Sequence, residues 1–203
     1  MRLFVALDVP PEIRERITRF VEGLQRYAPD ANWVKPASYH VTLKFLGETS
    51  PADAEQLKHI LAEIRSAPVN IAFRGFGFFP NTNSPRVFWA GMQHDDALPQ
   101  LANAVDQACS QLGIPREEHE FRPHLTLARG GSGSPRPKRG ERANPKLKYL
   151  AEKLQSFPVP DFGTMTAQEF FLYESKLSPA GAQYTKLERF VLGLIAVTYP
   201  QSC

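Results

Sequence analysis

One four-residue pattern occurs twice in this chain, as His40-Val41-Thr42-Leu43 and again as His124-Leu125-Thr126-Leu127. Both copies alternate polar and apolar residues, which is typical of a strand with one buried face. Each copy is followed closely by a glycine, Gly47 or Gly130. A solenoid would need more copies at a shorter spacing, so the repeat predicts two related lobes that each contribute one such strand.

The rest of the chain mixes helix-like and strand-like segments. Apolar residues recur at helical spacing after Pro10-Pro11, after Ser50-Pro51, before Gly113 and around residues 147–154. Segments rich in β-branched and aromatic residues predict strands over residues 1–8, 69–79, 86–91, 121–127, 169–177 and 184–192. The last two flank Ser178-Pro179-Ala180-Gly181, which predicts an antiparallel hairpin. An α+β fold follows from this mixture.

The repeated pattern places the same two side chains on one face of each strand. Side chains at i and i+2 share a face, so His40 lies beside Thr42 and His124 beside Thr126. Displacement at phosphorus needs a base and an acid on opposite sides of the reacting atom. Two imidazoles, with ordinary pKa values near ~6.5, can fill both roles at neutral pH. His40 and His124 are therefore the predicted catalytic residues.

The residues around the histidines predict how a phosphate is held. The hydroxyls of Thr42 and Thr126 can donate hydrogen bonds to phosphate oxygens, and Arg129 can add a cationic contact. Strict alternation would turn Phe45 toward the core and Lys44 toward the face of Thr42. Phe45 is therefore left outside the predicted substrate-binding set of Thr42, Thr126 and Arg129.

The repeat also separates two of the histidines from the others. A single His-x-Thr strand usually holds an ordinary half-buried histidine, but a second copy of the same pattern favours a shared function. The remaining histidines, His59, His94 and His119, have no such context and are predicted to lie on the surface.

Charge is concentrated in one segment, although the net charge is only +3. Residues 130–148 are rich in Gly, Ser and Pro and carry one acid, Glu141, against a group of cations. The cations are Arg136, Lys138, Arg139, Arg142, Lys146 and Lys148. A solvated loop and an RNA-contacting loop are equally good interpretations of this segment.

Cysteine content and the N-terminus indicate the compartment. The only cysteines are Cys109 and Cys203, too few for a disulfide framework or a cysteine-rich metal site. The apolar run at the N-terminus meets Asp8 and Pro10-Pro11 before it reaches the length of a signal peptide or membrane span. We therefore expect a cytoplasmic protein without a membrane partner.

Several segments together resemble the 2H phosphoesterase superfamily, and within it the RNA 2′,3′-cyclic phosphodiesterases, also called 2′-5′ RNA ligases. The similar segments are residues 1–7, 34–36, 40–48, 121–129, 174–179 and 181–184. The resemblance implies one bilobal domain over residues 1–203. It also implies two pseudo-symmetric lobes with antiparallel sheets around a central cleft, and helices on the outside. A monomer without metal or cofactor is expected.

The same resemblance implies a reaction. The substrate is RNA with a terminal 2′,3′-cyclic phosphate, and the product is a 2′-phosphate. His40 then protonates the leaving 3′ oxygen and His124 activates water, a division that the near-symmetric motifs alone do not determine. The related joining of RNA ends through a 2′-5′ linkage is the second implied activity.

Two other functions fit parts of the sequence. A metallohydrolase could use His40 and His124 as ligands, but neither motif holds a carboxylate within its four residues. An RNA-binding module could grip phosphate ends through the basic segment, and it would not need two titratable imidazoles. Activity in the presence of a chelator excludes the first function, and loss of turnover on replacing either histidine excludes the second.

Overall fold

The strands form two antiparallel sheets in a computed structural model that describes residues 1–130, 147–178 and 181–193. One sheet has four strands in the order β3-β1-β8-β9, and the other has five in the order β2-β6-β5-β4-β7. The strands are β1 (Arg2–Asp8), β2 (Asn32–Trp33), β3 (His40–Glu48), β4 (Val69–Phe79), β5 (Val87–His94), β6 (Leu125–Arg129), β7 (Asp161–Ala167), β8 (Glu169–Ser178) and β9 (Gly181–Val191). The predicted α+β fold is confirmed.

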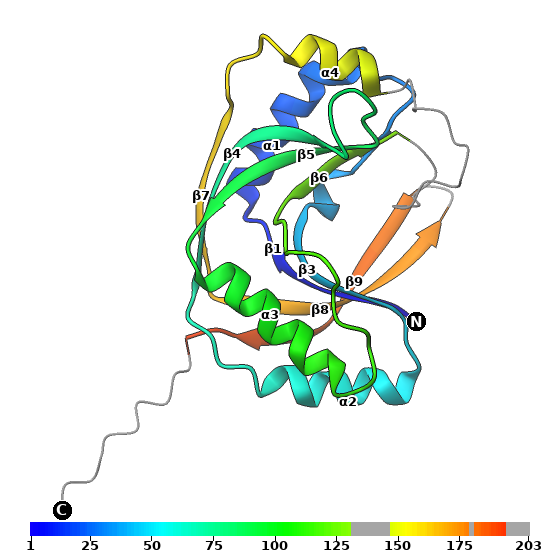
Figure 1. Cartoon of the computed structure of the whole chain (residues 1–203), viewed down its shortest axis with the longest axis vertical. Coiled ribbons are helices and arrows are strands. Elements are labelled where there is room, and N and C mark those ends of the chain that lie inside the picture. The colour runs from blue at the N-terminus through cyan, green and yellow to red at the C-terminus, as the bar shows by residue number, and fades with distance from the viewer. Residues whose placement is uncertain (131–146, 179–180, 194–203) are drawn as a thin grey trace, which may run out of the picture.

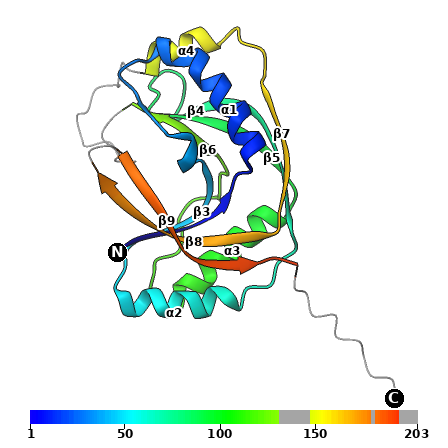
Figure 2. The ribbon, with the colours of Figure 1, turned by 180° about the vertical axis from the view of Figure 1, so that it is seen from behind.

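Helices cover the outer sides of this pair of sheets. They are α1 (Pro11–Leu24), α2 (Pro51–Ala62), α3 (Ala97–Ser110) and α4 (Lys148–Leu154). Figures 1 and 2 show α2 and α3 against the four-stranded sheet, and α1 and α4 on the side of the five-stranded sheet. No helix among the described residues is long and apolar enough to cross a membrane.

The sequence explains where two of these helices begin. Pro11 stands at the first turn of α1, where its missing N–H costs nothing, and the buried face of α1 carries Ile13 and Ile17 at helical spacing. Ser50 caps α2, because its side-chain oxygen accepts a hydrogen bond from the Asp53 N–H at 3.1 Å. These two helices begin at the prolines that mark them in the sequence.

One hydrophobic core joins the two sheets. It includes the fully buried Val5 and Val41 from the four-stranded sheet and Phe73 and Leu125 from the five-stranded sheet. A smaller cluster lies on the other face of the four-stranded sheet, formed by Phe4, Ala6, Phe171 and Tyr173. His40 lies next to this smaller cluster, at a ring distance of 4.9 Å from Phe4, so this face borders the candidate site.

Most of the predicted strands are present, with differences at their ends. Segment 69–79 coincides with β4, and the predicted hairpin is the antiparallel pair β8 and β9. Its turn residues 179–180 lie outside the described residues. The sequence did not predict β2, which has two residues, or β7, whose sequence DFGTMTA has few apolar residues. Both missed strands are at sheet edges.

Candidate active site

The two motif histidines hold different positions relative to their strands. His40 is the first residue of β3 and lies opposite Asp8 of β1, whereas His124 comes directly before β6. The prediction of a strand over 121–127 is therefore wrong in its first half. Pro123 has no N–H for a sheet ladder, and β6 lies between β2 and β5, so pairing begins only at Leu125.

The two imidazoles are nevertheless held in the same way. The His40 Nδ1 lies 2.7 Å from the carbonyl oxygen of Ser38, and the His124 Nδ1 lies 2.8 Å from that of Arg122. A carbonyl oxygen only accepts, so Nδ1 carries the hydrogen in each ring. The Nε2 atom of each neutral ring is then an acceptor that can take or return a proton.

Aromatic rings flank each imidazole. His40 has Phe4 at 4.9 Å and Tyr184 at 5.1 Å between ring centroids, and His124 has Phe79 at 5.0 Å and Trp89 at 6.5 Å. Both histidines are half-buried. The predicted site contained none of these four rings, because they come from other segments of the chain and lie outside the two His-x-Thr motifs.

The surroundings favour neutral imidazoles in the free protein. Burial lowers the pKa of His40 to about 4. The charges of Arg129 and His124 also lower this pKa, whereas the charge of Asp8 raises it. Burial also lowers the pKa of His124, again with a contribution from Arg129. An anionic ligand between the rings would oppose these effects and favour a protonated imidazole.

Each motif strand has a β-bulge directly after its threonine. In β3, Thr42 pairs with Ala6 and Lys44 pairs with Val5, so Leu43 is an extra residue. In β6, Thr126 pairs with Trp89 and Ala128 pairs with Phe88, so Leu127 is an extra residue. A bulge inverts the alternation of side chains beyond it. The third residue after each threonine, Phe45 or Arg129, therefore lies on the same face of the strand as the histidine.

The first bulge overturns the prediction for Phe45 and Lys44. Phe45 is 60% exposed and its ring lies 6.2 Å from Phe4, on the face that carries His40. Lys44 is 2% exposed and points into the protein. Its Nζ donates hydrogen bonds to Asp106 Oδ1 at 2.6 Å and to the carbonyl oxygen of Pro115 at 2.9 Å. The predicted orientation of Phe45 toward the core assumed a regular strand and is wrong.

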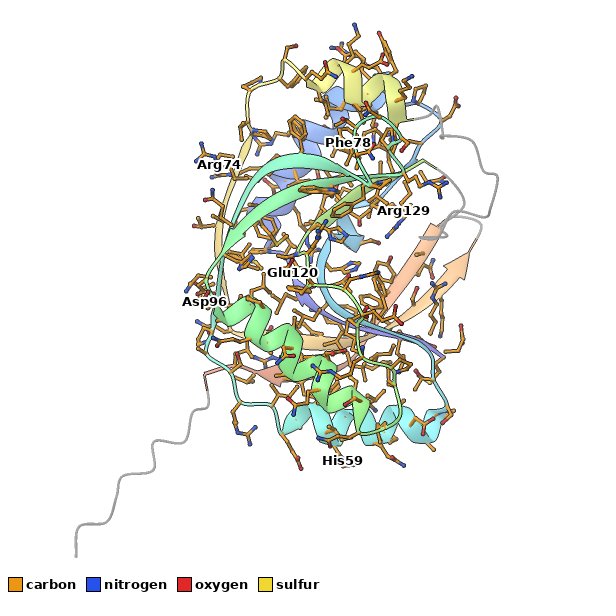
Figure 3. The ribbon with its side chains drawn as sticks, viewed as in Figure 1. His59, Arg74, Phe78, Asp96, Glu120 and Arg129 are labelled. Atoms are coloured by element: carbon orange, nitrogen blue, oxygen red, sulfur yellow. The ribbon has the colours of Figure 1, made fainter. Side chains whose placement is uncertain are left out.

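The second bulge places Arg129 on the histidine side. The charge of Arg129 lowers the pKa of both His40 and His124. After burial, the electrostatic interaction with Tyr184 of the other sheet has the largest effect on the pKa of Arg129 itself. Figure 3 shows Arg129 at the end of β6 that faces β9. Burial lowers the pKa of Arg129, but a guanidinium remains a cation at neutral pH. The structure thus brings His40, His124 and Arg129 within electrostatic range.

The two predicted threonines lie one step along the same faces. Thr42 is opposite Ala6 in β1, and Thr126 is opposite Trp89 in β5. Both side chains are half-buried. Because i and i+2 share a face and the bulge comes only after the threonine, each hydroxyl lies on the side of its own histidine.

A groove of about 580 Å³ lies next to the rings that flank His124. Phe79 and Trp89, the two rings that flank His124, are among its lining residues, and segment 120–123 forms another part of its wall. Glu120 marks this segment in Figure 3. The groove therefore adjoins the aromatic rings and the segment that flank His124.

The other three histidines lie on the surface, and His94 is among the residues that line the groove. His59, His94 and His119 are all exposed, as predicted, and Figure 3 shows His59 on α2, far from Arg129. Segment 131–146, with most of the basic residues, lies outside the described residues; Lys148 begins α4. Within the described part of the chain, no group of three His, Cys, Asp or Glu residues is arranged to hold a metal ion.

Comparison with protein families gives two matched ranges. The family described as LigT like Phosphoesterase matches residues 7–89 and 92–184. The first range contains the His40 motif and the second contains the His124 motif. Each matched range therefore contains one copy of the repeated pattern.

Individual proteins are similar over almost the whole chain. The RNA 2′,3′-cyclic phosphodiesterase of Archaeoglobus fulgidus is 35% identical, covering 94% of this chain and 99% of that protein. The protein of the same name from Methanocaldococcus jannaschii is 33% identical, and the similarity covers 94% of this chain and 100% of that protein. Among solved structures, E. coli LigT complexed with 3′-AMP is 30% identical, covers 94% and 97%, and has a TM-score of 0.74.

Proposed function

Because this chain belongs to the LigT-like phosphoesterase family, we propose that it hydrolyses terminal 2′,3′-cyclic phosphates on RNA to 2′-phosphates. Relatives at 33–35% identity carry the name RNA 2′,3′-cyclic phosphodiesterase. The observation that carries the proposal is the matched pair of imidazoles, each with Nδ1 at a backbone carbonyl oxygen and with no hydrogen-bond partner for Nε2 among the described residues. One such ring on each side of a phosphorus atom suits an in-line displacement.

In the proposed reaction, His40 is the acid and His124 the base. His124 Nε2 takes a proton from water as the water oxygen bonds to phosphorus. The bond from phosphorus to the 3′ oxygen breaks, and the protonated His40 gives its proton to that oxygen. The product is a 2′-phosphate, and each ring has exchanged one proton. The phosphate charge supports protonation of His40, whose pKa is low in the free protein.

The direction of this proton transfer is supported by the side chains beyond the two bulges. Phe45 offers an exposed ring next to His40, on which a nucleobase can stack. The ribose and its leaving 3′ oxygen then lie on the His40 side. Arg129, with Thr42 and Thr126, is proposed to hold the phosphate oxygens, which leaves the His124 side for water.

A second proposed activity is the joining of RNA ends. A 5′-hydroxyl in the place of water would give a 2′-5′ linkage with the same two histidines in the same roles. The groove of about 580 Å³ lined by Phe79 and Trp89, the rings that contact His124, supports this activity, because a nucleoside needs more room than water. Water and the 5′-hydroxyl would compete for the same position.

We further propose that residues 1–203 act as one bilobal domain, a cytoplasmic monomer that needs no metal or cofactor. The site takes one motif from each sheet, and one hydrophobic core joins the sheets. The free Cys109 is buried, which suits a reducing compartment. A sedimentation measurement that gave a stable dimer would overturn the monomer.

The decisive experiment uses RNA ending in a 2′,3′-cyclic phosphate, incubated with the protein and an excess of EDTA. We expect full turnover and a 2′-phosphate product, identified by nuclear magnetic resonance of phosphorus. Activity lost with EDTA and restored by a metal would support a metallohydrolase. Binding without turnover would support an RNA-binding module, and a 3′-phosphate product would contradict the proposed breaking of the 3′ bond.

A further inference from the structure

Tyr184 lies at the centre of the contacts around His40, although it lies outside both His-x-Thr motifs. Its ring centroid is 5.1 Å from that of His40, at an interplanar angle of 88°, and 5.0 Å from that of Phe4. The side chain is half-buried and comes from β9, on the far side of β1 and β8 from β3. The ring is therefore fixed against the imidazole by its neighbours.

The hydroxyl of Tyr184 differs from that of its neighbour Tyr173. The Tyr173 hydroxyl donates a hydrogen bond to Asp8 Oδ1 at 2.6 Å, and its ring stacks on Phe4 at 5.1 Å. Within residues 1–130, 147–178 and 181–193, the Tyr184 hydroxyl has no such acceptor. A hydrogen bond from a half-buried phenol to a new acceptor is favourable, because such a phenol loses fewer hydrogen bonds to water than an exposed one does.

Two arginines interact electrostatically with the Tyr184 phenol. Among charged groups, Arg129 from the five-stranded sheet has the largest effect on the pKa of Tyr184, which it lowers. Arg2 at the start of β1 also lowers this pKa. In turn, Tyr184 has the largest effect on the pKa of Arg129 apart from that of burial. Burial raises the pKa of Tyr184, so the phenol keeps its proton and is a donor at neutral pH.

We propose that Tyr184 is a further catalytic residue, whose hydroxyl donates a hydrogen bond to a non-bridging oxygen of the phosphate held by Arg129. This inference rests on the proposed function, since it assigns a partner at the same phosphate. The phosphate then receives one hydrogen bond from Tyr184 of the four-stranded sheet and one from Arg129 of the five-stranded sheet. The proton stays on the phenol throughout, so no step is added to the displacement.

The test compares Tyr184→Phe with Tyr173→Phe, measuring kcat on RNA with a 2′,3′-cyclic phosphate and the affinity for inorganic phosphate. Loss of one donor to a developing oxyanion costs about 100-fold or more in kcat at well-organised sites, so we expect a loss of about 10- to 100-fold for Tyr184→Phe. Phosphate affinity should fall severalfold. Tyr173→Phe, whose hydroxyl serves Asp8, should stay within about twofold of wild type.

Tyr184→Phe keeps the ring that contacts His40 and Phe4, so it should fold like the wild type. If it matches the wild type in kcat while the wild type is active, Tyr184 is not catalytic and the inference is overturned. If the wild type does not hydrolyse the substrate at all, the proposed function fails, and phosphate affinity decides the inference alone. Equal phosphate affinity in both proteins would then overturn it, and weaker binding by Tyr184→Phe would support it.

Discussion

The strands β3 and β6 repeat the same backbone device and then differ in one side chain. Each places a threonine two residues after its histidine and inserts one extra residue, Leu43 or Leu127, directly after that threonine. The residue that the bulge returns to the histidine face is Phe45 in the first strand and Arg129 in the second. An aromatic ring suits a base, and a guanidinium suits a phosphate. Two similar halves can thus hold the two ends of one nucleotide.

The strongest way to break this comparison is to remove each imidazole. General acid or base catalysis contributes about 10²- to 10⁴-fold, so His40→Ala and His124→Ala should each lower kcat by that much on RNA cyclic phosphate. Both side chains are half-buried, and both variants should remain folded by circular dichroism. His59→Ala, on the exposed face of α2, is the matched control with unchanged activity. Near-normal turnover in either active-site variant would refute the pairing.

Removing the two residues beyond the bulges should have opposite kinetic signatures. Arg129→Ala should lower kcat by about 100-fold, because a cation at the phosphate stabilises the transition state. Phe45→Ala should mainly raise KM, by about 5- to 100-fold, since stacking of one base contributes about 1–3 kcal/mol. A cyclic phosphate of a small diol without a base is the control substrate. If Phe45→Ala impairs its hydrolysis equally, Phe45 does not act on the base.

The dependence of kcat/KM on pH should reflect the low pKa values of both rings. The pKa of His40 is about 4 and that of His124 is also lowered, so few free molecules carry the proton that the acid needs at pH 7. Raising the pH removes that proton, and kcat/KM should peak below about pH 6.5 and fall toward pH 8.

Arg129 supplies a check on this pH dependence. Because its charge lowers the pKa of both histidines, Arg129→Ala should move the alkaline side of the profile to higher pH. A profile that stays flat to pH 8 with chemistry rate-limiting would contradict the role of protonated imidazole.

The smallest expected effect concerns the residues on the inner side of the bulges. Lys44 holds Asp106 and Pro115, whereas its counterpart in β6 is the apolar, fully buried Ala128. Lys44→Met leaves Asp106 paired with Arg116 at 2.9 Å, so we expect a loss of about 1–3 kcal/mol in unfolding free energy, measured by urea titration. Glu117→Gln, at 57% side-chain exposure, should change it by less than about 0.5 kcal/mol. Equal stabilities would contradict a structural role for Lys44.

The sequence predicted the parts of this molecule that depend on local pattern. The repeated motif led to His40 and His124, and β-branched and aromatic content led to β4 along its full length. It did not predict the bulges, because a bulge depends on how β1 and β5 pair with the motif strands. One signal was available. Phe45 and Arg129 stand at the same offset from their histidines, so placing Arg129 in the site implied the same place for Phe45.

Other parts of the site depend on contacts between distant segments. Tyr184 and Trp89 reach the histidines from β9 and β5, and no spacing in the sequence relates them to the motifs. The buried Lys44 likewise has its partner on α3, at Asp106. Such residues are found only once the sheets are assembled, because their chemistry depends on packing rather than on neighbours in the chain.

The division of labour between the two lobes can be tested with an RNA whose cyclic phosphate carries sulfur in place of the bridging 3′ oxygen. A thiolate is a far better leaving group than an alkoxide and needs no proton from an acid. On this substrate, His40→Ala should recover most of the wild-type rate, while His124→Ala should remain slow for lack of a base. Recovery of His124→Ala instead, or of neither variant, would contradict the assignment of His40 to the ribose and His124 to water.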